Sequence, residues 1–207
     1  SGLVRMNLVN NEISTYNTSN SILSNNLLHI TKDAHNNLLV SSRDKGLFIQ
    51  YKNKWIQISP ANGLPDNHIN YMLFDKSGHL WLATASSGIV KIEKNELYRF
   101  LEEEAAVISY EIFNMQEQAI YQQVFTLAQD KNGLIWYGLF GGGVGYIKDG
   151  EVKLMAMNRK LNSRNVYGLV YDRNKNILWV STDKGLASVR LSNQSVAVEV
   201  QTLSAGD

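Results

Sequence analysis

The side chains best suited to chemistry are few and scattered in this 207-residue chain, which has no cysteine and four histidines. His29, His35, His68 and His79 fall in different parts of the sequence, with no carboxylate at metal-ligand spacing. We therefore expect neither a metal site nor a cofactor. The stretch "GLFGGGVG" from Gly138 has the glycines of a phosphate loop but lacks the Lys-Ser/Thr that follows in such loops. We interpret it as a turn between strands.

Hydrolytic chemistry is also poorly supported. Asp75, Gly78 and Trp81 are spaced much as in the Asp-box of sialidase propellers, which has one residue fewer between Asp and Gly. An enzyme of that kind needs an arginine cluster and a Tyr–carboxylate pair, and the seven arginines here show no recurrent placement. Other glycosidases use carboxylate pairs whose separation of roughly 5–9 Å is spatial and leaves no mark in a sequence. We predict no enzyme and assign no catalytic residue, with a polysaccharide lyase or hydrolase as the least favoured alternative.

A repeated phrase organises the chain. "DKSGHLWLATASSGI", residues 75–89, is closely matched by segments that begin at Asp33, Asp130 and Asp172. The four Asp anchors lie 42, 55 and 42 residues apart. That period is typical of four-stranded propeller blades rather than of helical repeats.

The segments between the anchors are typical of strands. The run after each Asp turn is apolar on both faces, as expected for a blade sandwiched between two others. The last strand of each unit is predicted at "KWIQIS", "ELYRF", "EVKLMAM" and "SVAVEV". We predict an all-β fold of propeller blades with four antiparallel strands each, eighteen strands or about four and a half blades, forming an incomplete propeller fragment. The chain is one partial β-propeller, 1–207, with a half blade at 2–18 and blades at 26–59, 68–100, 122–157 and 165–202.

Two further structural predictions follow from the repeat. The Asp75 side chain is expected to bond nearby backbone N–H groups while Gly78 takes positive φ. Trp81, Trp136 and Trp179 are expected to be buried between blades. The 55-residue interval exceeds the others by 13 residues, which we place as an insertion within 101–122. The acidic run Glu102–Glu104 favours a short helix there. The insertion is either a tolerated, solvated loop or blade-edge cap, or a functional element that acts as a lid or contacts a partner.

Composition narrows the partners. Hydrophobic residues make up 44% and charged residues 19%, with a formal net charge of +1. This balance predicts no binding to nucleic acid. No apolar run approaches the roughly 18 residues that a membrane span needs, so this segment is not expected to insert into a membrane.

One unit carries a family resemblance. "NGLPDNHINYMLFDKSGHLWLATASSGIVKI", residues 62–92, is similar to the repeat of two-component regulator propellers. The resemblance implies a periplasmic input domain of a large bacterial membrane sensor. Such sensors include hybrid histidine kinases that respond to oligosaccharides, and sometimes receptors with cyclic-nucleotide output. A carbohydrate ligand and a downstream output domain are therefore implied.

The binding surface is predicted from position in the repeat. Connections from an outermost strand to the next innermost strand share one face with the turns between second and third strands. We call this the loop face, and the Asp turns lie at the opposite end. Loops on a rigid scaffold commonly carry function. The best candidates for ligand contact are His68, Tyr121, Phe140 and Arg164.

Two partner classes stay open. Because the first 18 residues match only the second half of a unit, we expect an open arc. Unpaired sheet edges recruit strands, so other blades or domains of a parent protein, or a second chain, are expected partners. The alternative to an oligosaccharide sensor is a structural or protein-interaction propeller that binds no small molecule.

Overall fold

The computed structural model describes residues 2–19, 24–103, 107–114 and 123–203, and the strands in these ranges form five antiparallel sheets. The first sheet has two strands, β1 (Leu3–Met6) and β2 (Ile13–Tyr16). The second is β3 (Leu27–Lys32), β4 (Leu38–Ser42), β5 (Leu47–Tyr51) and β6 (Lys54–Ile58). The third is β7 (Ile69–Phe74), β8 (Leu80–Thr84), β9 (Ile89–Ile92) and β10 (Glu111–Phe113). The fourth is β11 (Val124–Gln129), β12 (Ile135–Leu139), β13 (Gly143–Lys148) and β14 (Glu151–Leu154), and the fifth is β15 (Val166–Asp172), β16 (Ile177–Thr182), β17 (Gly185–Leu191) and β18 (Ala197–Leu203).

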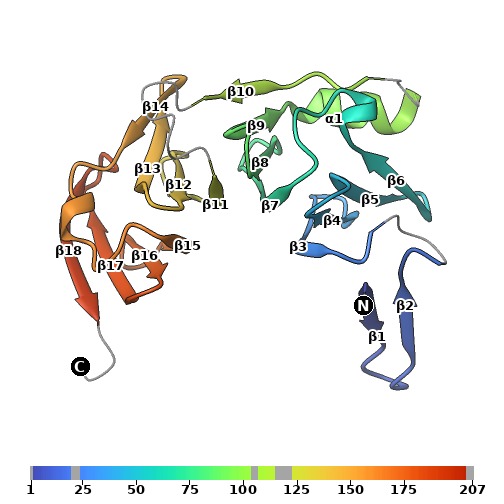
Figure 1. Ribbon diagram of the computed structural model, residues 1–207, viewed down its shortest axis with the longest axis horizontal. Coiled ribbons are helices and arrows are strands. Elements are labelled where there is room, and N and C mark those ends of the chain that lie inside the picture. The colour runs from blue at the N-terminus through green and yellow to red at the C-terminus, as the bar shows by residue number, and fades with distance from the viewer. Residues whose placement is uncertain (1, 20–23, 104–106, 115–122, 204–207) are drawn as a thin grey trace.

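The sheets are arranged as an open arc, with β3, β7, β11 and β15 on its concave side (Figure 1). Within each four-stranded sheet, consecutive strands pair in chain order. The β1–β2 hairpin and the β15–β18 sheet stand on opposite sides of the opening (Figure 1). This arrangement confirms the predicted all-β fold built from four-stranded propeller blades.

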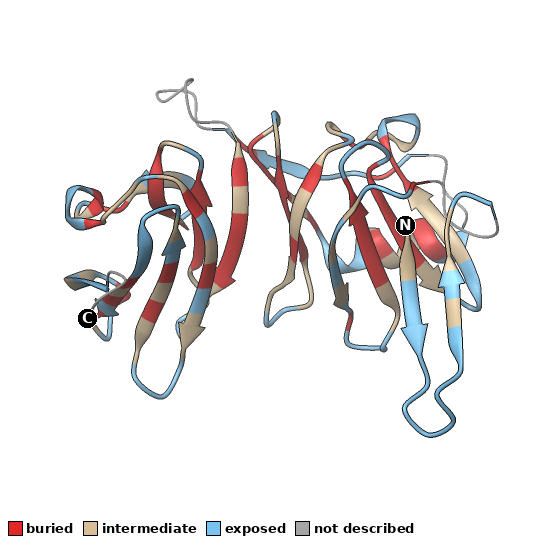
Figure 2. Ribbon diagram, turned by 60° about the horizontal axis from the view of Figure 1, so that its bottom comes forward, coloured by how far each residue is buried: buried red, intermediate tan, exposed pale blue. Residues whose placement is uncertain are grey.

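The hydrophobic core lies between the sheets. Three clusters of buried residues join neighbouring pairs: β3–β6 with β7–β10, β7–β10 with β11–β14, and β11–β14 with β15–β18. Figure 2 shows the buried positions concentrated where sheets face one another, whereas the β1–β2 hairpin is largely exposed. The strands β8 and β12 are buried at every position, which explains why they are apolar without alternation.

The Asp turns form as predicted. In the turn between β7 and β8, the Asp75 carboxylate accepts backbone N–H bonds from Ser77 at 2.9 Å and His79 at 3.0 Å. Gly78 has a φ of +85°. The second carboxylate oxygen of Asp75 accepts the indole N–H of Trp81 at 2.8 Å, a bond that ties the turn to the interface between sheets.

The prediction for the three tryptophans is correct for two of them. Trp81 is 6% exposed and Trp136 is fully buried. Trp179 is only half-buried. It lies on the face of the β15–β18 sheet that carries the exposed Val170, its pairing partner on β15, and this face is turned away from the core shared with β11–β14. Burial of this repeat position therefore depends on a sheet packed against both faces.

The strand predicted at "ELYRF" is wrong. Residues Lys94–Glu103 form helix α1, and the fourth strand of this sheet is β10, at Glu111–Phe113. Leu97, Phe100 and Leu101 are buried against β3–β6 and β7–β10. The helix was predicted to start at the acidic run, but it ends there, at Glu103. The insertion therefore lies between β9 and β10, and its helix packs against both the β3–β6 and the β7–β10 sheets.

Helix α1 also completes an Asp turn that lacks its tryptophan. Leu39 stands where Trp81 and Trp136 occur in later sheets, and the Asp33 carboxylate in that turn accepts a hydrogen bond from the Tyr98 hydroxyl at 2.7 Å. Asp33 also accepts the side-chain amide of Asn37 at 2.7 Å. The hydrogen bonds from Tyr98 and Asn37 outweigh partial burial and lower the pKa of Asp33. A hydroxyl from an inserted helix thus replaces the missing indole donor.

Candidate ligand-binding surface

Each innermost strand of the four-stranded sheets carries a β-bulge at its second residue. The pairing register shifts between Leu27 and His29, Ile69 and Tyr71, Val124 and Thr126, and Val166 and Gly168. The residues skipped in the pairing are Leu28, Asn70, Phe125 and Tyr167. Bulges re-aim a side chain and often lie next to functional sites. In each four-stranded sheet, one residue near the loop face is thereby left out of the strand pairing. It belongs to the innermost strand, which borders the concave side of the arc (Figure 1).

Two of the bulged residues belong to an exposed aromatic cluster. The Phe125 ring lies 5.3 Å from the Tyr167 ring and 6.0 Å from the Phe140 ring, measured between centroids. Phe140 is 46% exposed and Tyr167 is 45% exposed. We call Phe125, Phe140 and Tyr167 the aromatic patch. Contiguous exposed rings are uncommon on a soluble surface and mark sites of interaction.

Backbone hydrogen bonds hold the patch in place. The Phe140 N–H donates to the Gln123 carbonyl at 3.2 Å, at the start of β11. Gly141 donates to the Asn165 side chain at 2.9 Å, and Gly143 donates to the Arg164 carbonyl at 2.9 Å. These bonds fasten the turn between β12 and β13 to the segment that enters β15.

Gly143 has a structural reason to be glycine. Its φ is +84°, and a Cβ placed there would lie 2.6 Å from the side-chain oxygen of Asn158. The Asn158 amide bridges both backbone groups of Val144, at 2.8 Å each. The glycine-rich stretch is therefore a turn between strands, as predicted.

The structure brings two of the four predicted ligand residues together. Phe140 belongs to the patch, and Arg164 adjoins it through the bond to Gly143. His68 is half-buried on the preceding sheet, where its carbonyl accepts the Ala85 N–H at 3.1 Å. Tyr121 lies outside the described residues. The prediction that these residues bind ligand stays a prediction.

Phe125 and Tyr167 were not predicted. A bulge leaves no signal in a strand without alternation, so the sequence does not mark them. An aromatic residue at the second position of two successive innermost strands is a feature by which the sequence could have indicated them. Asn70, at the equivalent position of β7, donates its side-chain N–H to the Val124 carbonyl at 2.8 Å. That bond links β7 to the strand that carries Phe125.

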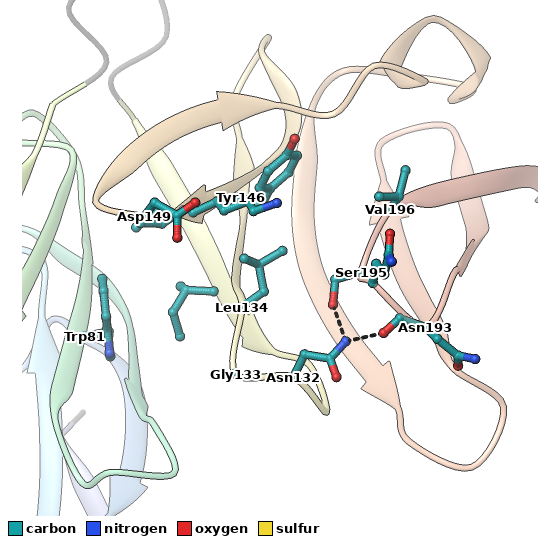
Figure 3. Close-up of a pocket in the computed structure, with 13 residues that line it drawn as sticks. Trp81, Asn132, Gly133, Leu134, Tyr146, Asp149, Asn193, Ser195 and Val196 are labelled. Carbon is teal, nitrogen blue, oxygen red and sulfur yellow. Dashed lines mark hydrogen bonds between the residues drawn. The ribbon is translucent and has the colours of Figure 1, made fainter.

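A second concavity lies at the opposite end of the sheets. A groove of about 470 Å³ is lined by the turn after β11, the turn after β13, the turn after β17 and Trp81. Figure 3 shows Asn132 reaching across it to Ser195 and Asn193, with donor–acceptor distances of 2.9 and 2.8 Å. The Trp81 ring packs 5.2 Å from Phe113 and is only 6% exposed, so it offers no free stacking face. The aromatic patch is the better candidate for ligand binding.

Neither metal-dependent chemistry nor a membrane span has structural support in the described ranges. Within them, no group of three His, Cys, Asp or Glu side chains is placed to hold a metal ion. No helix in the same ranges has the length and apolar character to cross a bilayer.

Comparison with known proteins supports the resemblance read from the sequence. Residues 63–86 match the family described as "Two component regulator propeller". No curated protein matches the chain.

Solved structures share the fold. The extracellular domain of BT4673 from B. thetaiotaomicron, described as a hybrid two-component system, is 17% identical with a TM-score of 0.77; the match covers 95% of this chain and 27% of that one. The corresponding domain of BT3049 from the same organism is 22% identical with a TM-score of 0.70, covering 94% and 24%. Virginiamycin B lyase from Staphylococcus aureus is 14% identical with a TM-score of 0.63, covering 87% and 56%. This chain thus spans about a quarter of the length of the two sensor domains, and likeness at these identities shows a common fold.

Proposed function

We propose that this chain is part of the periplasmic sensory propeller of a bacterial two-component receptor and that it binds an oligosaccharide at the aromatic patch. The observation that carries the proposal is the exposure of Phe140 and Tyr167, each close to half, on a rigid blade edge. Their rings are fixed by Phe125 between them and by the hydrogen-bonded turn of Phe140. The proposal assigns no catalytic step.

The chemistry of the patch suits a sugar. Aromatic faces bind the apolar C–H surface of a pyranose ring, while neighbouring amides and cations bond its hydroxyl groups. Asn165 and Arg164 lie directly beside the patch, joined to its turn by the bonds to Gly141 and Gly143. The likeness to extracellular domains of proteins described as two-component systems supports a sensory role.

A second candidate function is a protein-interaction propeller. The outward face of the β15–β18 sheet exposes Val170 (66%), Leu203 (43%) and Leu186 (38%) around the half-buried Trp179. These apolar side chains fit a packed protein surface better than a soluble sugar. It lies on a different surface from the aromatic patch, so the two functions can be tested separately.

The test is binding of the 207-residue chain to a panel of soluble neutral and acidic oligosaccharides, followed by isothermal titration of each hit. Phe140→Ala and Tyr167→Ala should each weaken binding about tenfold, because each removes an aromatic contact worth on the order of 1–2 kcal/mol. Tyr110→Ala is the matched control, since Tyr110 is an aromatic residue of similar exposure (37%) in the segment that leads into β10. Equal affinity of all three variants and the wild type would place the ligand elsewhere. Absence of any hit would leave the interaction function as the better account.

A further inference from the structure

Within the described ranges, Arg164 is a cation beside the aromatic patch whose side chain has no partner. Its side chain is exposed, and its backbone is fixed by the bond from the Gly143 N–H to its carbonyl. Among the described residues, no acceptor lies within hydrogen-bonding or ion-pair distance of the Arg164 guanidinium. The backbone of Arg164 is therefore fixed beside the patch, and its exposed side chain is available to a ligand.

Other arginines of the chain show the contrast. Arg99 donates to both carboxylate oxygens of Glu96, at 2.6 and 3.0 Å. Arg190 pairs with Glu199 across neighbouring strands. Arg99 and Arg190 thus have carboxylate partners, which Arg164 does not have among the described residues.

The sequence around Arg164 is basic. Residues 152–171 include Lys153, Arg159, Lys160 and Arg164 but no Asp or Glu. The nearby carboxylate of Asp183, in the turn between β16 and β17, accepts the Asn165 amide at 2.9 Å. Hydrogen bonds from Ser163 and Asn165, the residues on either side of Arg164, lower the pKa of Asp183, so this carboxylate stays ionised and bonded to the segment that carries Arg164. It forms no ion pair with Arg164 in the described structure.

We infer that the ligand of the aromatic patch is an acidic oligosaccharide whose carboxylate or sulfate group is bound by Arg164. The inference rests on the proposed function and deepens it. A sugar ring that stacks on Phe140 or Tyr167 sits next to the segment that carries Arg164, because Asn165 is bonded to Gly141 and Tyr167 is the third residue after Arg164. A guanidinium fits carboxylate and sulfate oxygens with two parallel hydrogen bonds, which a neutral hydroxyl cannot match.

The experiment compares acidic oligosaccharides with neutral counterparts of the same backbone. The probes are oligogalacturonides and their methyl esters, and sulfated oligosaccharides and their desulfated forms, including glycosaminoglycan and algal sources. Titrations use the 207-residue chain at two salt concentrations. An acidic probe should bind at least about tenfold more tightly than its neutral counterpart, since hydrogen bonds between charged groups contribute about 1.5–3 kcal/mol. Whether the oligogalacturonides or the sulfated oligosaccharides bind identifies the acidic group of the ligand as carboxylate or sulfate.

Two variants distinguish a direct contact between Arg164 and the ligand from general attraction of an acidic ligand to a basic protein surface. Arg164→Gln should weaken acidic binding at least about tenfold and leave neutral binding unchanged. Arg173→Gln is the control, because Arg173 is an exposed arginine in the Asp turn at the opposite end of the same sheet. Its loss should change affinity less than about twofold, because exposed charges beyond a Debye length of roughly 8–10 Å are largely screened.

The outcomes distinguish this inference from the proposed function. If neutral probes bind as well as acidic ones, or if Arg164→Gln binds normally while Phe140→Ala does not, the acidic ligand is wrong and the sugar site stands. If no oligosaccharide binds the wild-type chain, both are overturned. If acidic probes bind but Phe140→Ala and Arg164→Gln leave their affinity unchanged, the site lies elsewhere and both assignments to this surface fail.

Discussion

Replacing equivalent tryptophans in neighbouring sheets should have very different costs. Trp136 is fully buried in the cluster shared by the β11–β14 and β15–β18 sheets, and its ring lies 5.2 Å from that of Tyr146. Its indole N–H donates to Asp130 at 3.1 Å. Trp179 follows its own Asp anchor at nearly the same repeat position but is only half-buried.

The burial sets the expected magnitudes. Trp136→Ala should lower the free energy of unfolding by about 3–5 kcal/mol, the usual range for truncating a buried large aromatic residue. Trp179→Ala should cost roughly 1–2 kcal/mol, because its ring is only half-buried in the folded protein. Trp136→Phe removes the indole donor of Asp130, which is 1% exposed, together with part of the buried ring, so its cost should be at least the roughly 1–3 kcal/mol of an unsatisfied buried acceptor.

Urea unfolding followed by circular dichroism measures all three variants, with the slope of each transition checked against the wild type. The expected order of destabilisation places Trp136→Ala first and Trp179→Ala well below it. Equal losses for the two alanine variants would contradict the burial argument. That result would mean that the outward face of the β15–β18 sheet is covered in solution.

Two smaller perturbations probe helix α1 and its contacts. Tyr98→Phe removes the hydroxyl bonded to Asp33 and should lower the free energy of unfolding in urea by about 1 kcal/mol; an unchanged midpoint would show that the bond adds nothing. The hydrogen bond from Arg99 holds the pKa of Glu96 at about 2, below its usual 4.5. Because the folded-state pKa is lowered, this stabilisation is present above pH 4.5 and lost as the pH falls toward 2. Glu96→Gln should therefore be less stable than wild type at pH 7 and equal to it near pH 2, and a pH-independent difference would refute the linkage.

The repeat made the scaffold predictable. Each Asp anchor appears in the sequence because its carboxylate satisfies the backbone N–H groups of a tight turn, and Asp75 and Asp130 do so in the structure. The tryptophans were predictable for the same reason, since they pair with those carboxylates at a constant spacing. The exception, Trp179, depends on packing outside its own repeat, which a local pattern does not contain.

The alignment of repeats gave a wrong strand prediction in a segment whose apolar residues have helical spacing. "ELYRF" was assigned to a strand because it stands where other units have their last strand. Leu97, Phe100 and Leu101 are instead spaced as on one face of a helix, and that face is buried in the core between two sheets. The secondary structure of this segment therefore follows its helical spacing of apolar residues and not its position in the repeat.

The candidate site combines a constant backbone feature with a variable side chain. All four innermost strands of the four-stranded sheets bulge at the second residue, so the fold repeats a backbone position that is freed from pairing. The residues at that position are Leu28, Asn70, Phe125 and Tyr167, so an aliphatic, an amide and two aromatic side chains occupy it. Core positions vary less freely, because the shapes of their side chains must fit the neighbouring sheet. Side chains at the bulges can change without disturbing that packing, and two aromatic residues in succession give this part of the arc a surface suited to a sugar.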